Sequence, residues 1–190
     1  MEERTTSSIN ERLEQKIGFD RIRRIISDRC STNYAAERTA TETFCTSVSQ
    51  IRRRLLLTDE MRLIMMFEDG FPSGGFIDCI DFLKPLERSS SAIDLISLRK
   101  LKTMLETLRK VTAFFDDVKD GVYPNLKRMS SRVMGFPEVQ RRIEGIIDRY
   151  GDVKDTASDE LYEIRKSLRD KEGAISRRIS AILKKAQEEG

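Results

Sequence analysis

Apolar residues recur at intervals of three and four along most of this chain, which is the spacing of one face of an α-helix. The pattern is longest near the carboxyl end, where a seven-residue repeat runs through Leu161, Leu168, Ile175 and Ile182. No proline interrupts it, and a helix from residue 158 to residue 189 would span roughly 48 Å. The sequence predicts one long helix that projects beyond the domain before it. An amphipathic helix lying partly on its own domain is the alternative.

Shorter apolar segments precede this helix, and glycine, proline or capping residues separate them. Gly18 ends the first segment, and the sequence Phe71-Pro72-Ser73-Gly74-Gly75 forms a break that we interpret as a turn. No segment alternates with the two-residue period of a strand. The fold class is therefore predicted to be all-α: a helical core domain with a long projecting C-terminal lever-type helix. The expected helices cover residues 9–17, 19–26, 34–40, 48–68, 126–134 and 137–147, with a short element at 77–86. A further helix of about 25 residues follows the cap at Ser91 and is marked by apolar residues over 95–115.

Hydroxyl and carboxylate side chains at the segment starts are suited to accept hydrogen bonds from exposed backbone amides. Ser47 or Thr46 can cap the helix from Val48, and Thr156 or Ser158 the terminal helix. Ser91 is expected to cap the helix of residues 95–115, with Asp94 as its capping-box partner. Two apolar groups are predicted to be buried: the helix face Phe19, Ile22, Ile25 and Ile26, and the methionines Met61, Met65 and Met66.

The 190 residues suit one domain with a proper core and an extension. We predict a helical core domain over residues 1–155 and the start of a long lever or coiled-coil helix over residues 156–190. No apolar run approaches the ~20 residues of a membrane span. The polar, acidic start lacks the pattern of a signal peptide, so no membrane partner and a cytoplasmic location are expected.

The composition narrows the chemistry that this chain can perform. It contains no histidine, which removes histidine general bases and nearly all common catalytic zinc sites. The three cysteines have no paired spacing, so we interpret them as reduced. Glu68-Asp69 and Asp116-Asp117 lack a third convergent ligand, and Gly74-Gly75 lacks the phosphate-loop pattern. We therefore expect no catalytic, metal-binding or cofactor-binding residues in this chain.

A net charge of +3 gives no whole-molecule field that would recruit nucleic acid, so any such contact must come from local clusters. Guanidinium groups match phosphate oxygens, which makes the runs Arg52-Arg53-Arg54 and Arg141-Arg142 candidates. The alternative for each run is that its arginines lie on a solvent-exposed face and bind no ligand. The candidate DNA-binding residues are those near the far end of the projecting helix, where little else competes for a role: Arg177, Arg178, Lys184 and Lys185.

Several stretches, in combination and in the right order, resemble the amino-terminal region of the MutS-II family, the second bacterial branch of homologues of the mismatch repair protein MutS. Gly18-Phe19-Asp20-Arg21-Ile22 is similar to the family's Phe-Asp-Lys-Ile-type helix start, with Leu13 as its opening leucine, and residues 31–38 are similar to its Ser-Glu-Leu-Gly-x-Glu-Arg segment. Residues 71–78 resemble its Pro-x-Gly-Gly-x-x-Asp turn. The strongest resemblance is Gly151-Asp152-Val153-Lys154-Asp155 and the following residues to Leu161, with Ile164-Arg165.

This resemblance implies a fragment that contains the core and the first long lever helix. Family members continue into a clamp, an ATPase that uses ATP and Mg²⁺, and usually a small MutS-related nuclease domain, and these parts are absent here. The resemblance further implies homodimers, binding to branched or junction DNA, and suppression of recombination. Some members act on collided ribosomes.

Three hypotheses follow. The first is a non-catalytic core and lever fragment of a MutS-like DNA-binding ATPase in DNA repair or suppression of homologous recombination. The second is the same module in a ribosome-collision rescue factor, and the third is a generic helical protein-interaction or dimerisation domain. In all three the fragment itself is expected not to be an enzyme.

Overall fold

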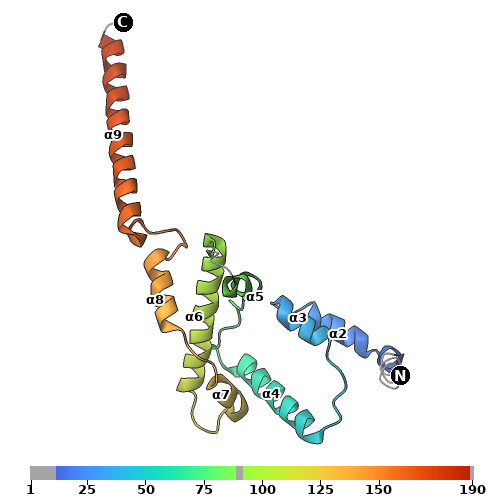
Figure 1. The fold of residues 1–190 in the computed structure, drawn as a ribbon. Coiled ribbons are helices and arrows are strands. Elements are labelled where there is room, and N and C mark those ends of the chain that lie inside the picture. The colour runs from blue at the N-terminus through green and yellow to red at the C-terminus, as the bar shows by residue number, and fades with distance from the viewer. Residues whose placement is uncertain (1–11, 89–91, 189–190) are drawn as a thin grey trace. The chain divides into compact units, whose positions relative to one another are not determined.

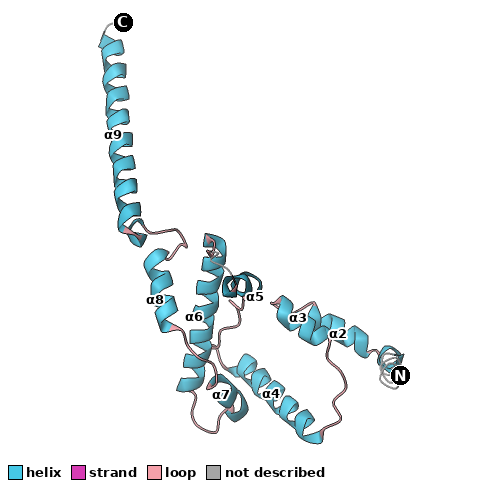
Figure 2. Ribbon diagram, viewed as in Figure 1, coloured by secondary structure: helices cyan, strands magenta, loops and turns pink. Residues whose placement is uncertain are grey.

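Every regular element in the described part of the protein is a helix, which confirms the all-α fold (Figure 2). The computed structural model describes residues 12–88 and 92–188. Within these ranges the extended backbone pairs at one isolated bridge, between Ile147 and Val153. Residues 12–17 are helical, and the elements that follow are α2 (Phe19–Ser27), α3 (Asn33–Ala40), α4 (Val48–Phe67), α5 (Ile80–Leu83), the 3₁₀ helix η1 (Lys84–Glu87), α6 (Leu95–Asp117), α7 (Pro124–Ser130), α8 (Pro137–Ile146), the 3₁₀ helix η2 (Asp155–Ala157) and α9 (Asp159–Glu188) (Figure 1).

Capping side chains start several of these helices. The Ser47 hydroxyl accepts from Gln50 N, and the Ser158 hydroxyl accepts from Leu161 N at 3.2 Å, so each settles a choice that the sequence left open. The predicted cap Ser91 lies outside the described residues. Asp94, expected to be its partner, is itself the cap of α6 and accepts from Ser97 N at 3.0 Å. A carboxylate at this position satisfies an otherwise unpaired amide and complements the helix dipole.

The described residues fall into two compact units, one within Met1–Gly135 and the other within Phe136–Gly190. Contacts along the chain define these units. The predicted division after residue 155, into a core domain and a lever helix, stays a prediction.

The core of the first unit lies where α4, α6 and α7 meet. Ile64, Phe115 and Leu126 are buried there, one from each helix. Phe71 and Phe114 pack around them, with the Phe71 ring edge-on to Phe114 at 5.2 Å between centroids. Aromatic rings in such edge-to-face geometry add to the stability that apolar burial supplies.

Two expected buried groups are exposed in the structure. Ile22, Ile25 and Ile26 remain 46–52% exposed, because α2 packs against the short α3 and gains no larger apolar partner. Met65 and Met66 are 58% and 60% exposed. They lie about 100° or more around α4 from Ile64, whereas the buried face runs through the positions of Ile64 and Glu60. The prediction that these apolar groups fill a core is wrong. The helix predicted for residues 126–134 also ends earlier, at Ser130, because residues 131–133 turn back onto its last carbonyls.

The second unit joins α8 to α9 through residues 147–158. Gly151 adopts a φ of 91°, which a residue without a Cβ accepts readily. The Asp148 carboxylate accepts from Tyr150 N and Asp152 N at 2.8 and 2.9 Å, which closes this turn. The Lys154 ammonium then donates to Glu144 O in α8 at 2.5 Å. The segment with the strongest family resemblance is therefore a hydrogen-bonded connection between two helices.

Candidate nucleic-acid interface

The four predicted DNA-binding residues lie in the second half of α9, and all four side chains are exposed. Arg177 and Lys184 are seven residues apart, as are Arg178 and Lys185, so each pair lies on one line along the helix. The structure brings these four cations onto one broad face about 12 Å long. Exposed guanidinium and ammonium groups on one face are chemically suited to contact phosphate oxygens.

An apolar stripe runs along a different side of the same helix. Leu168, Ile175, Ile179 and Ile182 are 52–67% exposed, and α9 contains no buried residue among those described. With 100° between successive residues, the stripe and the basic face are centred roughly 130° apart. The two faces can therefore meet different partners at once. Within its own unit α9 contacts the 3₁₀ helix η2 and leaves this stripe exposed. The projection of the helix beyond the preceding domain stays a prediction.

An aspartate fixes the first turns of α9. The Asp155 carboxylate accepts from Arg165 at 2.6 Å and from Arg169 at 2.5 Å. Arg165 also donates to Val153 O at 2.9 Å, so it ties the helix to the connection before it. The hydrogen bonds from Arg169 and then Arg165 lower the pKa of Asp155 below its ordinary value, because both guanidinium groups stabilise the carboxylate.

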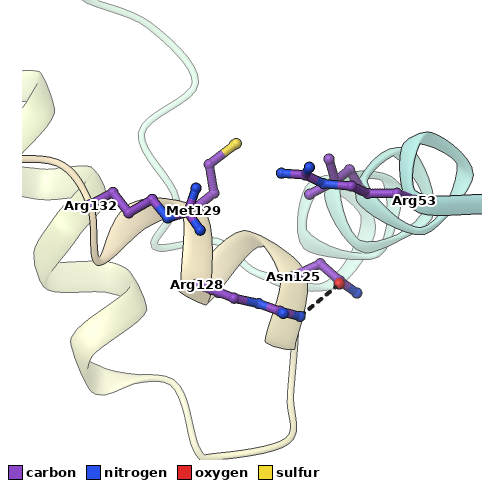
Figure 3. Close-up of a pocket in the computed structure, with 6 residues that line it drawn as sticks. Arg53, Asn125, Arg128, Met129 and Arg132 are labelled. Atoms are coloured by element: carbon purple, nitrogen blue, oxygen red, sulfur yellow. Dashed lines mark hydrogen bonds between the residues drawn. The ribbon is translucent and has the colours of Figure 1, made fainter. Parts of the chain in front are cut away.

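A second basic cluster lies in the first unit, at the end of the interface between α4 and α7. Figure 3 shows Arg53 of α4 and Arg132, which follows α7, directed into the same pocket, with Arg128 at its edge. The pocket has a volume of about 250 Å³, and Leu57 and Met129 supply its apolar lining. Sequence reasoning included Arg53 in a candidate run but missed its convergence with Arg128 and Arg132, which are more than 70 positions away.

A buried carboxylate positions one arginine of this cluster. Glu60 accepts from Leu126 N at 2.8 Å and from both the backbone and the side-chain nitrogen of Asn125, at 3.1 and 2.6 Å. These bonds satisfy amides at the start of α7. They also orient the Asn125 amide, whose oxygen accepts from Arg128 at 3.2 Å (Figure 3). Glu60 is thus a structural residue that positions Arg128 through Asn125.

The other motifs that the sequence offered have structural roles. Gly75, in the turn over residues 71–75, has a φ of 84°, and its carbonyl accepts from the Thr107 hydroxyl at 3.1 Å. This contact anchors the turn on α6 and confirms that the glycine pair forms a turn. The following Asp78 accepts from Tyr34 N at 3.1 Å and so ties the start of α3 to the same segment. Glu68 accepts from the Tyr123 hydroxyl at 3.0 Å.

The part of the chain that the structure describes contains no candidate metal site and no disulfide bond. No group of three metal-ligating side chains occurs there. Cys30, Cys45 and Cys79 are all free thiols, as predicted, and burial raises the pKa of the Cys79 thiol. None of the described helices is both long and apolar enough to cross a membrane.

Comparison with known proteins found distant similarity to several proteins that carry the same name. No family model matches it. It is 26% identical over 179 residues to the protein named Endonuclease MutS2 of Alkaliphilus oremlandii, 25% over 170 residues to that of Exiguobacterium sibiricum, and 26% over 175 residues to that of Thermomicrobium roseum. The matches cover 94%, 87% and 90% of this chain but only 22%, 21% and 22% of the relatives. The chain therefore spans about a fifth of the length of these curated relatives and is distantly similar to proteins named Endonuclease MutS2.

Proposed function

We propose that this chain is a non-catalytic core and lever module of a MutS2-like protein that binds DNA and acts in DNA repair or in the suppression of homologous recombination. The similarity to proteins named Endonuclease MutS2 along nearly the whole chain supports this assignment. The observation that carries it is α9, a helix with an exposed basic face and a separate apolar stripe.

The division of α9 into two faces suggests how the module works. The basic face would meet phosphates, which supplies affinity without sequence preference. The apolar stripe would pack against a second helix of the complete assembly, as paired helices in coiled coils do. The connection through Asp155, Arg165 and Arg169 would hold the direction of α9 relative to α8 while either partner is bound.

The relatives are named endonucleases, and we assign that chemistry to their length outside the aligned fifth. ATP and Mg²⁺ would bind there as well, in an ATPase domain. This chain lacks the phosphate-loop pattern and any histidine. We expect the homodimer to be formed by a longer protein. In that protein this module would contact DNA.

Charge reversal tests the DNA contact. Arg177→Glu, Arg178→Glu, Lys184→Glu and Lys185→Glu together should abolish binding to a labelled four-way junction, measured by fluorescence anisotropy. The wild-type chain should bind weakly, without sequence preference, and with an affinity that falls steeply as salt rises, since counterion release drives such contacts.

A matched control carries the same change of net charge elsewhere. Arg12, Arg21, Arg24 and Arg29 are exposed in the first unit, and their reversal to glutamate should reduce junction binding far less. Equal loss in both variants would show a net-charge effect and contradict the assignment to α9. Co-sedimentation with ribosomes in place of junction binding would favour the ribosome-rescue hypothesis instead.

A further inference from the structure

Three arginines of the first unit, Arg53, Arg128 and Arg132, line one pocket, and no acidic side chain is among its lining residues. The guanidinium groups of Arg53 and Arg132 form no hydrogen bond or ion pair with any residue that the structure describes, and Arg128 donates only to the neutral Asn125 amide. The nearest buried acid in this interface, Glu60, is already occupied by amides of α7. Like charges that face one pocket repel each other unless an anion lies between them. The pocket is therefore suited to an anion.

The geometry favours a phosphate. Figure 3 shows Arg53 and Arg132 approaching from opposite sides, so a bound group would receive donors from α4 and from the turn after α7. Guanidinium forks match the oxygens of phosphate and present fixed pairs of donors. The Glu60–Asn125–Arg128 chain of hydrogen bonds holds the third guanidinium at the pocket edge before any ligand arrives. Of the three guanidinium groups, that of Arg128 is therefore held in position before a ligand binds.

The pocket suits a phosphate of a polymer better than a free nucleotide. Sites for free small molecules are usually concave, larger than about 300 Å³, and bury most of their ligand. This pocket is about 250 Å³, and Arg53, Arg128 and Arg132 are all exposed. One phosphodiester can rest in such an opening while its neighbours along the strand make further contacts.

We propose that Arg53, Arg128 and Arg132 form a phosphodiester-binding site for a nucleic-acid strand, in addition to the basic face of α9. The proposal rests on the nucleic-acid binding proposed above and assigns a second contact to a different part of the chain. Arg53 and Arg132 contact the phosphate oxygens, and Arg128 neutralises the charge at the edge.

The test compares two charge reversals in the 190-residue chain. Arg53→Glu with Arg132→Glu should weaken binding to a labelled four-way junction at least about tenfold and reduce the slope of log K against log salt by about one, for the one phosphate contact that is lost. Arg52→Glu with Arg109→Glu carries the same charge change at exposed residues outside the pocket and should leave the slope nearly unchanged. Arg53→Lys with Arg132→Lys should retain part of the affinity, because charge remains while the fork geometry is lost.

The outcomes separate this proposal from the proposed function. Unchanged binding by Arg53→Glu with Arg132→Glu, together with loss in the α9 variant, overturns the pocket site and leaves DNA binding intact. Absence of junction binding by the wild-type chain at low salt overturns both. Nitrogen-15 spectra of the arginine side chains distinguish the source of the phosphate: saturable shifts of Arg53 and Arg132 with the junction support the site. Tighter binding of adenosine monophosphate than of the junction would overturn the polymeric ligand.

Discussion

The contact between Gly75 and Thr107 shows how one residue fixes a turn on a helix. At a φ of 84° a side chain is strained, and a Cβ at this position would also collide with the Thr107 hydroxyl. Gly74, its neighbour, has open space around it and an ordinary φ. The two glycines of the turn therefore have different physical roles although they are adjacent.

Gly75→Ala should lower the free energy of unfolding by at least about 1–2 kcal/mol, the cost of placing an L-residue in the left-handed region. Gly74→Ala is the matched control and should change stability by only a few tenths of a kcal/mol in either direction. Urea denaturation followed by circular dichroism measures both. Equal stability of the two variants would show that the Thr107 contact does not constrain the turn.

Asp155 gives the start of α9 a dependence on pH. Its pKa is lowered in the folded chain by Arg169 and Arg165, so the carboxylate contributes stability above its unfolded pKa. That contribution is lost as the pH falls from the ordinary aspartate range through the lowered folded pKa. Amide hydrogen exchange in the first turns of α9 should therefore accelerate at acid pH.

The variant Asp155→Asn should show this faster exchange already at neutral pH, because the amide cannot form the two ion pairs. Glu163→Gln removes one exposed carboxylate from the same helix without a described partner and is the control. If exchange in the two variants has the same pH profile, the Asp155 pairs do not hold the helix start.

The apolar stripe of α9 is exposed along its length, and no described residue covers it. Burial of apolar surface contributes roughly 25 cal/mol per Å², so ~400 Å² of recovered burial would offer about 10 kcal/mol before the costs of association are subtracted. Gly173 lies within the helix and lowers its propensity by about 1 kcal/mol relative to alanine. The stripe beyond Gly173 therefore favours either association or fraying.

We expect either a concentration-dependent dimer through antiparallel α9 helices or fraying of the turns beyond Gly173, measured by sedimentation velocity and hydrogen exchange. Ile175→Lys with Ile182→Lys should abolish a dimer, because it places charge in the stripe. Ser176→Lys with Ser180→Lys adds the same charge off the stripe and should preserve it. A wild-type chain that stays monomeric at high concentration, with α9 protected to its end, would contradict the idea of an unpaired lever.

The elements were predictable from sequence where the apolar period and the capping residues agree, as in α4 and α9. In α6 the period predicted the helix, but the cap is Asp94 and not Ser91. Burial was less predictable, since periodicity identifies an apolar face but not whether a partner exists to cover it. The isoleucines of α2 illustrate this difference: their spacing is regular, yet α3 is too short to bury them. The pocket arginines were not predictable as a group, because only folding brings Arg53 next to residues 128 and 132.

For the molecule as a whole, the arrangement of charge matters more than its sum. A net charge of +3 is small, yet cations are concentrated on one face of α9 and around one pocket of the first unit. Acidic side chains elsewhere engage in helix caps and connections, as Asp94 and Asp155 do. Binding to a polyanion would therefore be local and salt-dependent.

The whole chain should neither hydrolyse ATP nor nick DNA, because it lacks a phosphate loop and a general-base constellation. Phosphate release and supercoiled-plasmid assays measure these activities. Turnover that survives repurification and disappears when a single named acidic residue is replaced would contradict this prediction. The same assays on a longer protein containing an ATPase domain provide the positive control.

The tie between α8 and α9 also has a mechanical consequence. Asp155, Lys154 and Asp148 fasten the base of α9 to the end of α8, while its 30 residues extend about 45 Å from that base. When a rigid helix rotates about one end, the displacement of its other end grows with its length. A rotation of α8 by about 10° would therefore move the far end of α9 by roughly 8 Å. Lys184 and Lys185 would thus change position by several ångströms while the contacts at the start of α9 stay the same.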